Sequence, residues 1–271
     1  MHFTKKLKQI LRERNTHLCI GLDSDIKKIP PFFQSFSNPV SEFNKLIIES
    51  TLDLVCAYKL NIAFYEKMGE TGWTALKESL KLIPENVITI ADAKRGDIEN
   101  TTELYAQAFF DELGFDSITV QPYMGADSVW PFIKRKNKFV FLLALTSNYS
   151  AKEIQFLKIG KKYLYEVIIE KALTWNAHKI GFVVGANHTR ELKDIASKYP
   201  ETPLLIPGIG AQKNSLGKTV SSISHNLYII NQSRSIIYSL PKAKDADEFT
   251  KTIRENAINA RDDINRAAMK G

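Results

Sequence analysis

Cysteine is scarce in this sequence of 271 residues, and long apolar runs are missing. The two cysteines, Cys19 and Cys56, have no CxxC or Cys/His spacing, which argues against a disulfide framework and against a structural zinc site. The five histidines show no metal-binding spacing either. The longest apolar run, Phe139 to Leu145, is far shorter than the roughly 18 residues of a membrane-spanning helix, so the sequence predicts no membrane span.

The N-terminal segment has no apolar core and no small-residue cleavage site, so it does not predict a secretory signal. Leu7, Ile10 and Leu11 recur at helical spacing and predict a short amphipathic helix before the first strand. The cytoplasm is then the expected compartment. The formal net charge is +7, but the lysines are spread along the chain without a nucleic-acid motif. We therefore expect a basic surface that attracts an anionic small molecule, with neither nucleic acid nor membrane as a partner.

Short apolar segments of strand character alternate with helical patterns along the chain. The predicted strands are His17 to Asp23, Val55 to Leu60, Val87 to Ala91, Ser117 to Gln121, Phe139 to Leu145, Ile180 to Val184, Pro203 to Ile206 and Leu227 to Ile230. The predicted helices are Ser41 to Leu54, Tyr65 to Leu82, Asn100 to Leu113, Ile154 to Trp175, Arg190 to Lys198 and Asp245 to Ala268. Continuous apolar strands are typical of a parallel sheet buried on both faces. The pattern predicts one α/β domain over residues 1–271, a (β/α)8 TIM barrel.

Charged residues follow the first three predicted strands, at the end of the barrel where active sites of this fold lie. Asp23 ends the first strand, Lys59 the second, and Asp92 and Lys94 the third. Because Asp92 and Lys94 are two residues apart, they are expected to share a strand face. Lys59 and Lys94, interleaved with Asp92 and Asp97, form an alternating array in which carboxylates keep the lysines protonated. A structural ion-pair network would give the same pattern, with Asp97 as a helix N-cap.

The motifs DAKRGDI, CIGLD, YKLN, LTSN, PGIGAQ and QSRSIIY lie on these strands, and together they resemble the orotidine 5'-phosphate decarboxylases. The likeness is greatest to the bacterial class that carries DAKRGDI, and it extends from the first strand to the eighth. The D-x-K-x-x-D pattern alone is shared with related sugar-phosphate lyases. The resemblance implies conversion of orotidine 5'-monophosphate to UMP and CO2, the last step of de novo pyrimidine nucleotide synthesis, without metal or organic cofactor.

The resemblance also implies roles for the charged residues. Loss of CO2 leaves a carbanion in the ring plane at C6 with no electron sink, so the protein must stabilise negative charge and supply a proton. Lys94 would be the ammonium beside C6 and the proton donor. Asp92 would lie near the substrate carboxylate, and Lys59 would orient Asp92 and reach the ribose.

By the same resemblance the protein is a homodimer whose sites are built from two chains. Asp97 would enter the site of the partner subunit together with Ile98 and Thr101. The sequence itself does not localise the apolar surface that such a dimer needs.

Other motif residues are expected to bind the rest of the substrate. Asp23, assisted by Asn61, would hold a ribose hydroxyl, and Thr146 and Ser147 would read the pyrimidine edge. The phosphate would bind where backbone amides of a glycine-rich turn approach it and a guanidinium grips it. The residues expected there are Pro207, Gly210, Gln212 and Arg234.

The sequence departs from the family pattern near the expected phosphate site. Ser235 stands where the family usually has glycine, and Glu99 replaces a usual small residue. The segment from Lys213 to His225 resembles a mobile loop, but it begins Lys-Asn-Ser where Gly-Gly is common. These changes concern affinity more than the type of reaction.

Two other functions remain open from the residues. One is a related (β/α)8 lyase or isomerase that acts on a sugar phosphate with Mg²⁺ held by the carboxylates. The other is a catalytically inactive barrel that binds nucleic acid or protein, although it would leave the charges at the barrel mouth unexplained.

Overall fold

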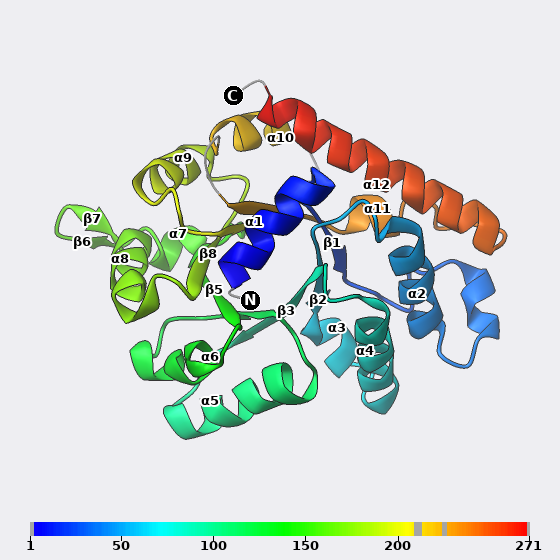
Figure 1. Ribbon diagram of the computed structural model, residues 1–271, viewed down its shortest axis with the longest axis horizontal. Helices are drawn as coiled ribbons and strands as arrows, with labels where there is room; N and C mark the ends of the chain where they lie inside the picture. Colours follow the sequence, from blue (N-terminus) through cyan, green and yellow to red (C-terminus); the bar gives the residue numbers. More distant parts are fainter. Residues whose placement is uncertain (1–2, 209–212, 224–226, 270–271) are drawn as a thin grey trace.

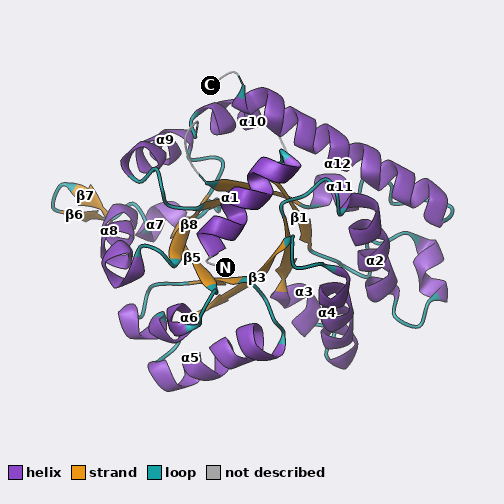
Figure 2. Cartoon of the chain, in the orientation of Figure 1, coloured by secondary structure: helices purple, strands orange, loops and turns teal. Residues whose placement is uncertain are grey.

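Eight parallel strands close into a barrel that helices surround (Figures 1 and 2). The computed structural model describes residues 3–208, 213–223 and 227–269. Around the barrel the strand order is β1-β10-β9-β8-β5-β4-β3-β2, and the neighbouring strands run parallel. The strands are β1 (Leu18–Leu22), β2 (Ala57–Asn61), β3 (Ile88–Arg95), β4 (Ser117–Val120), β5 (Phe139–Leu145), β8 (Ile180–Val184), β9 (Leu204–Ile206) and β10 (Tyr228–Gln232). This architecture confirms the predicted (β/α)8 TIM barrel.

The helices lie before the first strand, in the connections between strands and after the last strand. They are α1 (Phe3–Arg14), α2 (Pro39–Thr51), α3 (Ile62–Glu66), α4 (Glu70–Leu82), α5 (Glu99–Ala106), α6 (Trp130–Lys134), α7 (Ala151–Ile154), α8 (Leu164–Asn176), α9 (Thr189–Lys198), α10 (Lys213–Ser221), α11 (Arg234–Ile237) and α12 (Ala246–Ala268). Shorter elements are the 3-10 helices η1 (Pro31–Ser35) and η3 (Ala126–Ser128), the π-helical η2 (Gln107–Glu112), and an antiparallel hairpin of β6 (Lys158–Ile159) and β7 (Lys162–Tyr163).

Three predicted helices are interrupted or change type in the structure. The helix predicted over Tyr65 to Leu82 is two helices, because Gly69 adopts φ +60° between α3 and α4. The helix predicted over Ile154 to Trp175 is divided by the β6–β7 hairpin, whose turn contains Gly160 at φ +63°. The helix predicted over Asn100 to Leu113 is α-helical only to the end of α5 and continues as η2.

The segment predicted as a mobile loop from Lys213 to His225 contains a helix instead, since residues 213–221 form α10. Leu216 and Val220 are buried, four residues apart on one face of this helix, and Ile223 is buried in the turn after it. This face explains the helix, because α10 packs against α12. His225 itself lies outside the described residues.

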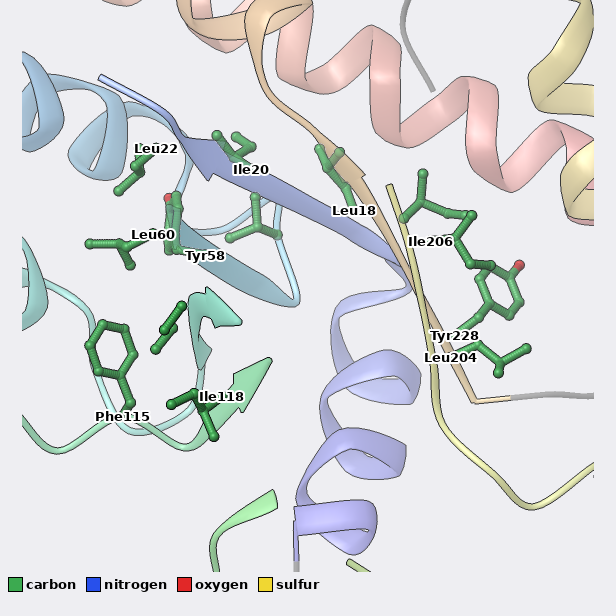
Figure 3. Close-up of a cluster of buried hydrophobic side chains, with 14 of the residues drawn as sticks. Leu18, Ile20, Leu22, Tyr58, Leu60, Phe115, Ile118, Leu204, Ile206 and Tyr228 are labelled. Carbon is green, nitrogen blue, oxygen red and sulfur yellow. The ribbon is translucent and has the colours of Figure 1, made fainter. Parts of the chain in front are cut away.

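The barrel core changes from apolar to charged along its axis. Side chains such as Leu18 and Ile20 point outward and pack in a cluster between strands and helices (Figure 3). A second cluster fills the barrel interior and includes Ile88 and Ile90 of β3. Two residues after Ile90, at the period that returns a side chain to the same face, comes Asp92. The polar end of the interior therefore lies at the C-terminal ends of the strands.

Helix α1 lies across the opposite end of the barrel (Figure 1). Its buried residues Phe3, Leu7 and Ile10 join the interior cluster. The ring of Phe3 stacks on Phe139 of β5 with 4.2 Å between centroids. Because this apolar face closes the N-terminal end of the barrel, α1 belongs to the core even though it precedes the first strand.

Replacing Leu7 with alanine is expected to lower the free energy of unfolding by about 2–5 kcal/mol, because a fully buried side chain would be lost and a cavity left. Urea unfolding followed by circular dichroism measures this change. Lys5→Ala is the matched control, since Lys5 is exposed on the same helix. Equal stability of the two variants would mean that α1 does not pack on the barrel in solution.

Candidate active site

Three charged side chains from two neighbouring strands meet at the C-terminal end of the barrel. Lys59 Nζ donates to Asp92 Oδ2 at 2.7 Å, and Lys94 Nζ donates to Asp92 Oδ1 at 2.5 Å. Lys59 also lies 3.7 Å from Asp23 Oδ1. Strand pairing brings these groups together, because Gly21 of β1 pairs with Lys59, and Lys59 in turn pairs with a residue of β3. Three members of the predicted array, Lys59, Asp92 and Lys94, thus lie together in one chain, with Asp23 close to Lys59.

Burial and ion pairing act in opposite directions on this array. Burial alone would raise the pKa of Asp92, but the ammonium groups of Lys59 and Lys94 hold it well below the ordinary carboxyl value. Lys59 is only 4% exposed, and burial alone would lower its pKa, yet Asp92 and Asp23 raise it above the ordinary value. Asp92 and Lys59 are therefore both ionised at neutral pH.

Asp23 has an acceptor atom without a hydrogen-bond donor among the described residues. Its Oδ1 atom is buried, and its nearest cation, Lys59, is beyond hydrogen-bonding distance. A buried carboxylate oxygen in this state is costly unless a ligand supplies the donor. Asn61, two residues after Lys59, ends β2 and pairs with Asp92 in the strand register.

A cavity of about 440 Å³ opens beside the array. Its lining contains Lys59, Asp92 and Lys94 from the array, with Thr146 and Ser147 from the predicted pyrimidine-binding segment. The other lining residues are Thr119, Leu143, Asn148, Gln155, Val183, Leu205 and Pro207. The charged groups therefore face a partly apolar space large enough for a small-molecule substrate.

Asp97 and its neighbours lie apart from the array within one chain. Asp97 Oδ1 accepts the backbone N–H of Ile98 at 2.7 Å, and Ile98 occupies the N-cap position of α5 without a side-chain cap. The alternative in which Asp97 is the N-cap is therefore wrong, because the N-cap of α5 is the next residue, Ile98. Ile98 is exposed and Thr101 is half-buried on α5, and none of the three lines the cavity.

The predicted phosphate site is described only in part, because Gly210 and Gln212 lie outside the described residues. Pro207 lines the cavity, and Arg234 is exposed at the start of α11, directly after β10. Among the described residues Arg234 makes no ion pair with a carboxylate, so its guanidinium is available to an anion. Ser235 donates its hydroxyl to Gln232 at 3.5 Å and so points back toward β10.

Three residues near the site were not predicted from the sequence. Thr119 of β4 donates its hydroxyl to Asp92 at 3.1 Å, and Gln155 holds Thr146 by two hydrogen bonds of 2.8 and 2.7 Å. The Arg95 guanidinium donates to the carbonyl of Ala93 at 2.9 Å. Only Arg95 could have been selected from the sequence, because it belongs to the DAKRGDI motif. Threonine in a strand and glutamine near the start of a helix are common and indicate no function.

No group of three His, Cys, Asp or Glu side chains that could hold a metal ion occurs within residues 3–208, 213–223 and 227–269. In the same part of the chain, the helices are all too short or too polar to cross a bilayer.

Comparisons with known proteins agree with this geometry. A family model described as "Orotidine 5'-phosphate decarboxylase / HUMPS family" matches residues 16–249. Curated proteins named orotidine 5'-phosphate decarboxylase are similar to the chain: one from Dehalococcoides mccartyi strain 195 is 46% identical over 98% of both chains. One from Christiangramia forsetii is 46% identical over 91% of both. The solved structure of Leishmania donovani OMP decarboxylase aligns with a TM-score of 0.84 at 33% identity, covering 99% of this chain and 100% of that chain.

Proposed function

The chain belongs to the orotidine 5'-phosphate decarboxylase family, and on that basis we propose that it converts orotidine 5'-monophosphate to UMP and CO2 with Lys94 as the proton donor. The observation that supports this role is the Lys59–Asp92–Lys94 array beside the cavity. The enzyme would act as a carboxy-lyase of pyrimidine synthesis in the cytoplasm.

The array suits a reaction that leaves a carbanion. The Lys94 side chain is 50% exposed and can reach a bound substrate, while Asp92 keeps its ammonium in place. When the C6–CO2 bond breaks, the electron pair stays on C6, and the nearby positive charge of Lys94 stabilises it. Lys94 then transfers a proton to C6, which yields UMP and a neutral amine that solvent reprotonates.

The remaining substrate groups have partners in the same region. The unsatisfied Oδ1 of Asp23 would accept a ribose hydroxyl, with Asn61 beside it, and Ser147 in the cavity wall would read the pyrimidine edge. Arg234, at the start of α11, and the segment that begins at Pro207 would hold the phosphate. Binding of this remote group supplies free energy that is realised at C6 in the transition state.

The test follows the ultraviolet change when orotidine 5'-monophosphate is added to purified protein in excess EDTA. We expect UMP to form at the same rate with and without the chelator, because the lysines supply the positive charge that a metal would otherwise provide. Absence of turnover, with turnover of a sugar phosphate in Mg²⁺, would refute the proposal and favour the related lyases.

We also propose that the enzyme is a homodimer that uses one apolar face. Large apolar side chains are exposed at the N-cap of α5, on α5, on α6 and before η3, and α5 packs against both α6 and η3. They are Ile98, Leu104, Tyr123, Met124 and Trp130. An apolar face of this kind is typical of a protein interface, and Asp97 precedes α5, so a partner on this face would meet it.

Mixing two inactive variants is expected to restore activity if each site uses two chains. After subunit exchange between Lys94→Ala and Asp97→Ala, half of the dimers are mixed and one of their two sites is intact. Activity should then reach about a quarter of the wild-type value. Lys94→Ala mixed with Asp92→Asn is the control, because both changes damage the site of their own chain and should give no recovery. Equal results from both mixtures would contradict the shared site.

A further inference from the structure

Strand β3 is irregular at the point where it carries the array. Its register against β4 runs from Ala91 paired with Ile118 to Arg95 paired with Val120. Three residues of β3, Asp92 to Lys94, therefore lie opposite a single residue of β4, Thr119. Bulges of this kind bend a strand and redirect a side chain, and they are frequent beside active sites.

Lys94 adopts an unfavourable backbone conformation at this irregularity. Its φ is +49°, in the left-handed region that side chains other than those of glycine and asparagine seldom adopt. The strain is maintained only if the surrounding structure holds the backbone in place. Neighbouring carbonyls are fixed, because Ala93 O accepts from Arg95 Nη1 at 2.9 Å and Arg95 O accepts from Gln121 N at 2.9 Å.

The amide of Lys94 has lost its place in the strand ladder and bonds to a side chain. Lys94 N donates to Thr119 Oγ1 at 3.0 Å. The Thr119 hydroxyl then donates its own proton to Asp92 Oδ1 at 3.1 Å. Thr119 is 1% exposed, although it lines the cavity, so its hydroxyl is largely shielded from bulk water. One hydroxyl thus joins the backbone of the lysine to the carboxylate that holds the same lysine's ammonium.

We propose that Thr119 is a positioning residue for decarboxylation, because its hydroxyl holds Lys94 in the left-handed conformation and aligns Asp92 with it. This inference rests on the proposed function. Without the hydroxyl, the Lys94 amide loses its acceptor, and the bulge can relax toward a regular strand. Lys94 Nζ would then move relative to the substrate, whereas the groups expected to bind ribose and phosphate would stay in place.

The central variant is Thr119→Val, which keeps the shape of the side chain and removes both hydrogen bonds. We expect kcat to fall about 10- to 100-fold, as for other small misplacements of a reacting group, with KM and the Kd for UMP within about threefold of wild type. Thr119→Ser keeps the hydroxyl and should retain kcat within about threefold. A Thr119→Val enzyme with wild-type kcat, or a Thr119→Ser enzyme as slow as Thr119→Val, would overturn the inference.

Thr89 supplies the matched control on the neighbouring strand. Its hydroxyl makes the same pair of bonds, accepting from Asp116 N at 3.0 Å and donating to Asp116 Oδ2 at 3.3 Å, but it lies in β3 at the closed end of the barrel. Thr89→Val should lower the melting temperature about as much as Thr119→Val and leave kcat unchanged. If both variants lose kcat equally, the effect of Thr119 is merely structural and the inference fails.

Crystal structures of the wild type and of Thr119→Val separate this inference from the proposed function. We expect the variant to change the φ of Lys94 and to lengthen the Lys94 Nζ–Asp92 Oδ1 separation. An unchanged geometry would overturn the inference whether or not the wild type decarboxylates its substrate. Absence of wild-type turnover would refute the proposed function, and with it the role of Thr119 in decarboxylation, even if the variant changes the geometry of Lys94 as expected.

Discussion

Replacement of Lys94 with alanine is expected to reduce kcat between about 10⁴- and 10⁷-fold. A positioned proton donor contributes about 10²–10⁴ to the rate. A charge aimed at the developing anion contributes about 10²–10³ more. Lys94 is proposed to do both, since its ammonium is fixed on Asp92 beside the cavity. The ultraviolet assay in excess EDTA measures the loss.

UMP binding shows whether the loss comes from chemistry or from folding. Because the phosphate and ribose partners are separate groups, Lys94→Ala should still bind UMP in calorimetry. Lys136→Ala is the control, since Lys136 is exposed near the closed end of the barrel and should keep wild-type kcat. Activity of Lys94→Ala within a few-fold of wild type would remove Lys94 from its role.

The second large effect is expected for Asp92→Asn. The change removes the negative charge between two ammonium groups and leaves Lys59 buried with Asp23 at 3.7 Å. We expect kcat to fall at least about 10²-fold, because Lys94 is no longer held. We also expect a loss of about 3 kcal/mol in the free energy of unfolding, at the low end for a broken buried ion pair, since Asp23 compensates in part.

The loss in free energy of unfolding caused by Asp92→Asn should become smaller as the pH falls. The pKa of Asp92 is lower in the folded chain than the ordinary value near 3.9, so the stabilisation is present above that value and disappears as pH falls below it. Urea unfolding should therefore show a constant difference between wild type and Asp92→Asn from about pH 7 to 5, and a smaller one below about pH 4. A difference that grows toward low pH would contradict the assigned ionisation.

Asp116→Asn is the matched control for Asp92→Asn. Asp116 pairs with Lys6 at 2.7 Å near the closed end of the barrel. Its loss should reduce stability but leave kcat at the wild-type value, because the pair lies at the other end of the strands. Loss of kcat in this variant as well would mean that general destabilisation explains both results.

Parts of the fold with strong local signals were predictable. The strand predictions Phe139 to Leu145 and Ile180 to Val184 match β5 and β8, because each is a short apolar run that begins directly after a lysine. Helix interruptions were missed at Gly69 and in the β6–β7 hairpin, where apolar periodicity continues across a turn. Helix α10 was missed because packing against α12 supports it, and that contact is distant in sequence.

The features of the candidate site also fall into a part that the sequence predicts and a part that depends on the tertiary structure. The sequence by itself determined the barrel and the charges at three strand ends, because strand periodicity and strand order place Lys59 and Asp92 at one end of a parallel barrel. Only the tertiary structure decided how Lys94 is aimed. Its left-handed backbone and its bond to Thr119 depend on the register of β3 against β4, and a register between strands is set by packing of the whole barrel rather than by local sequence.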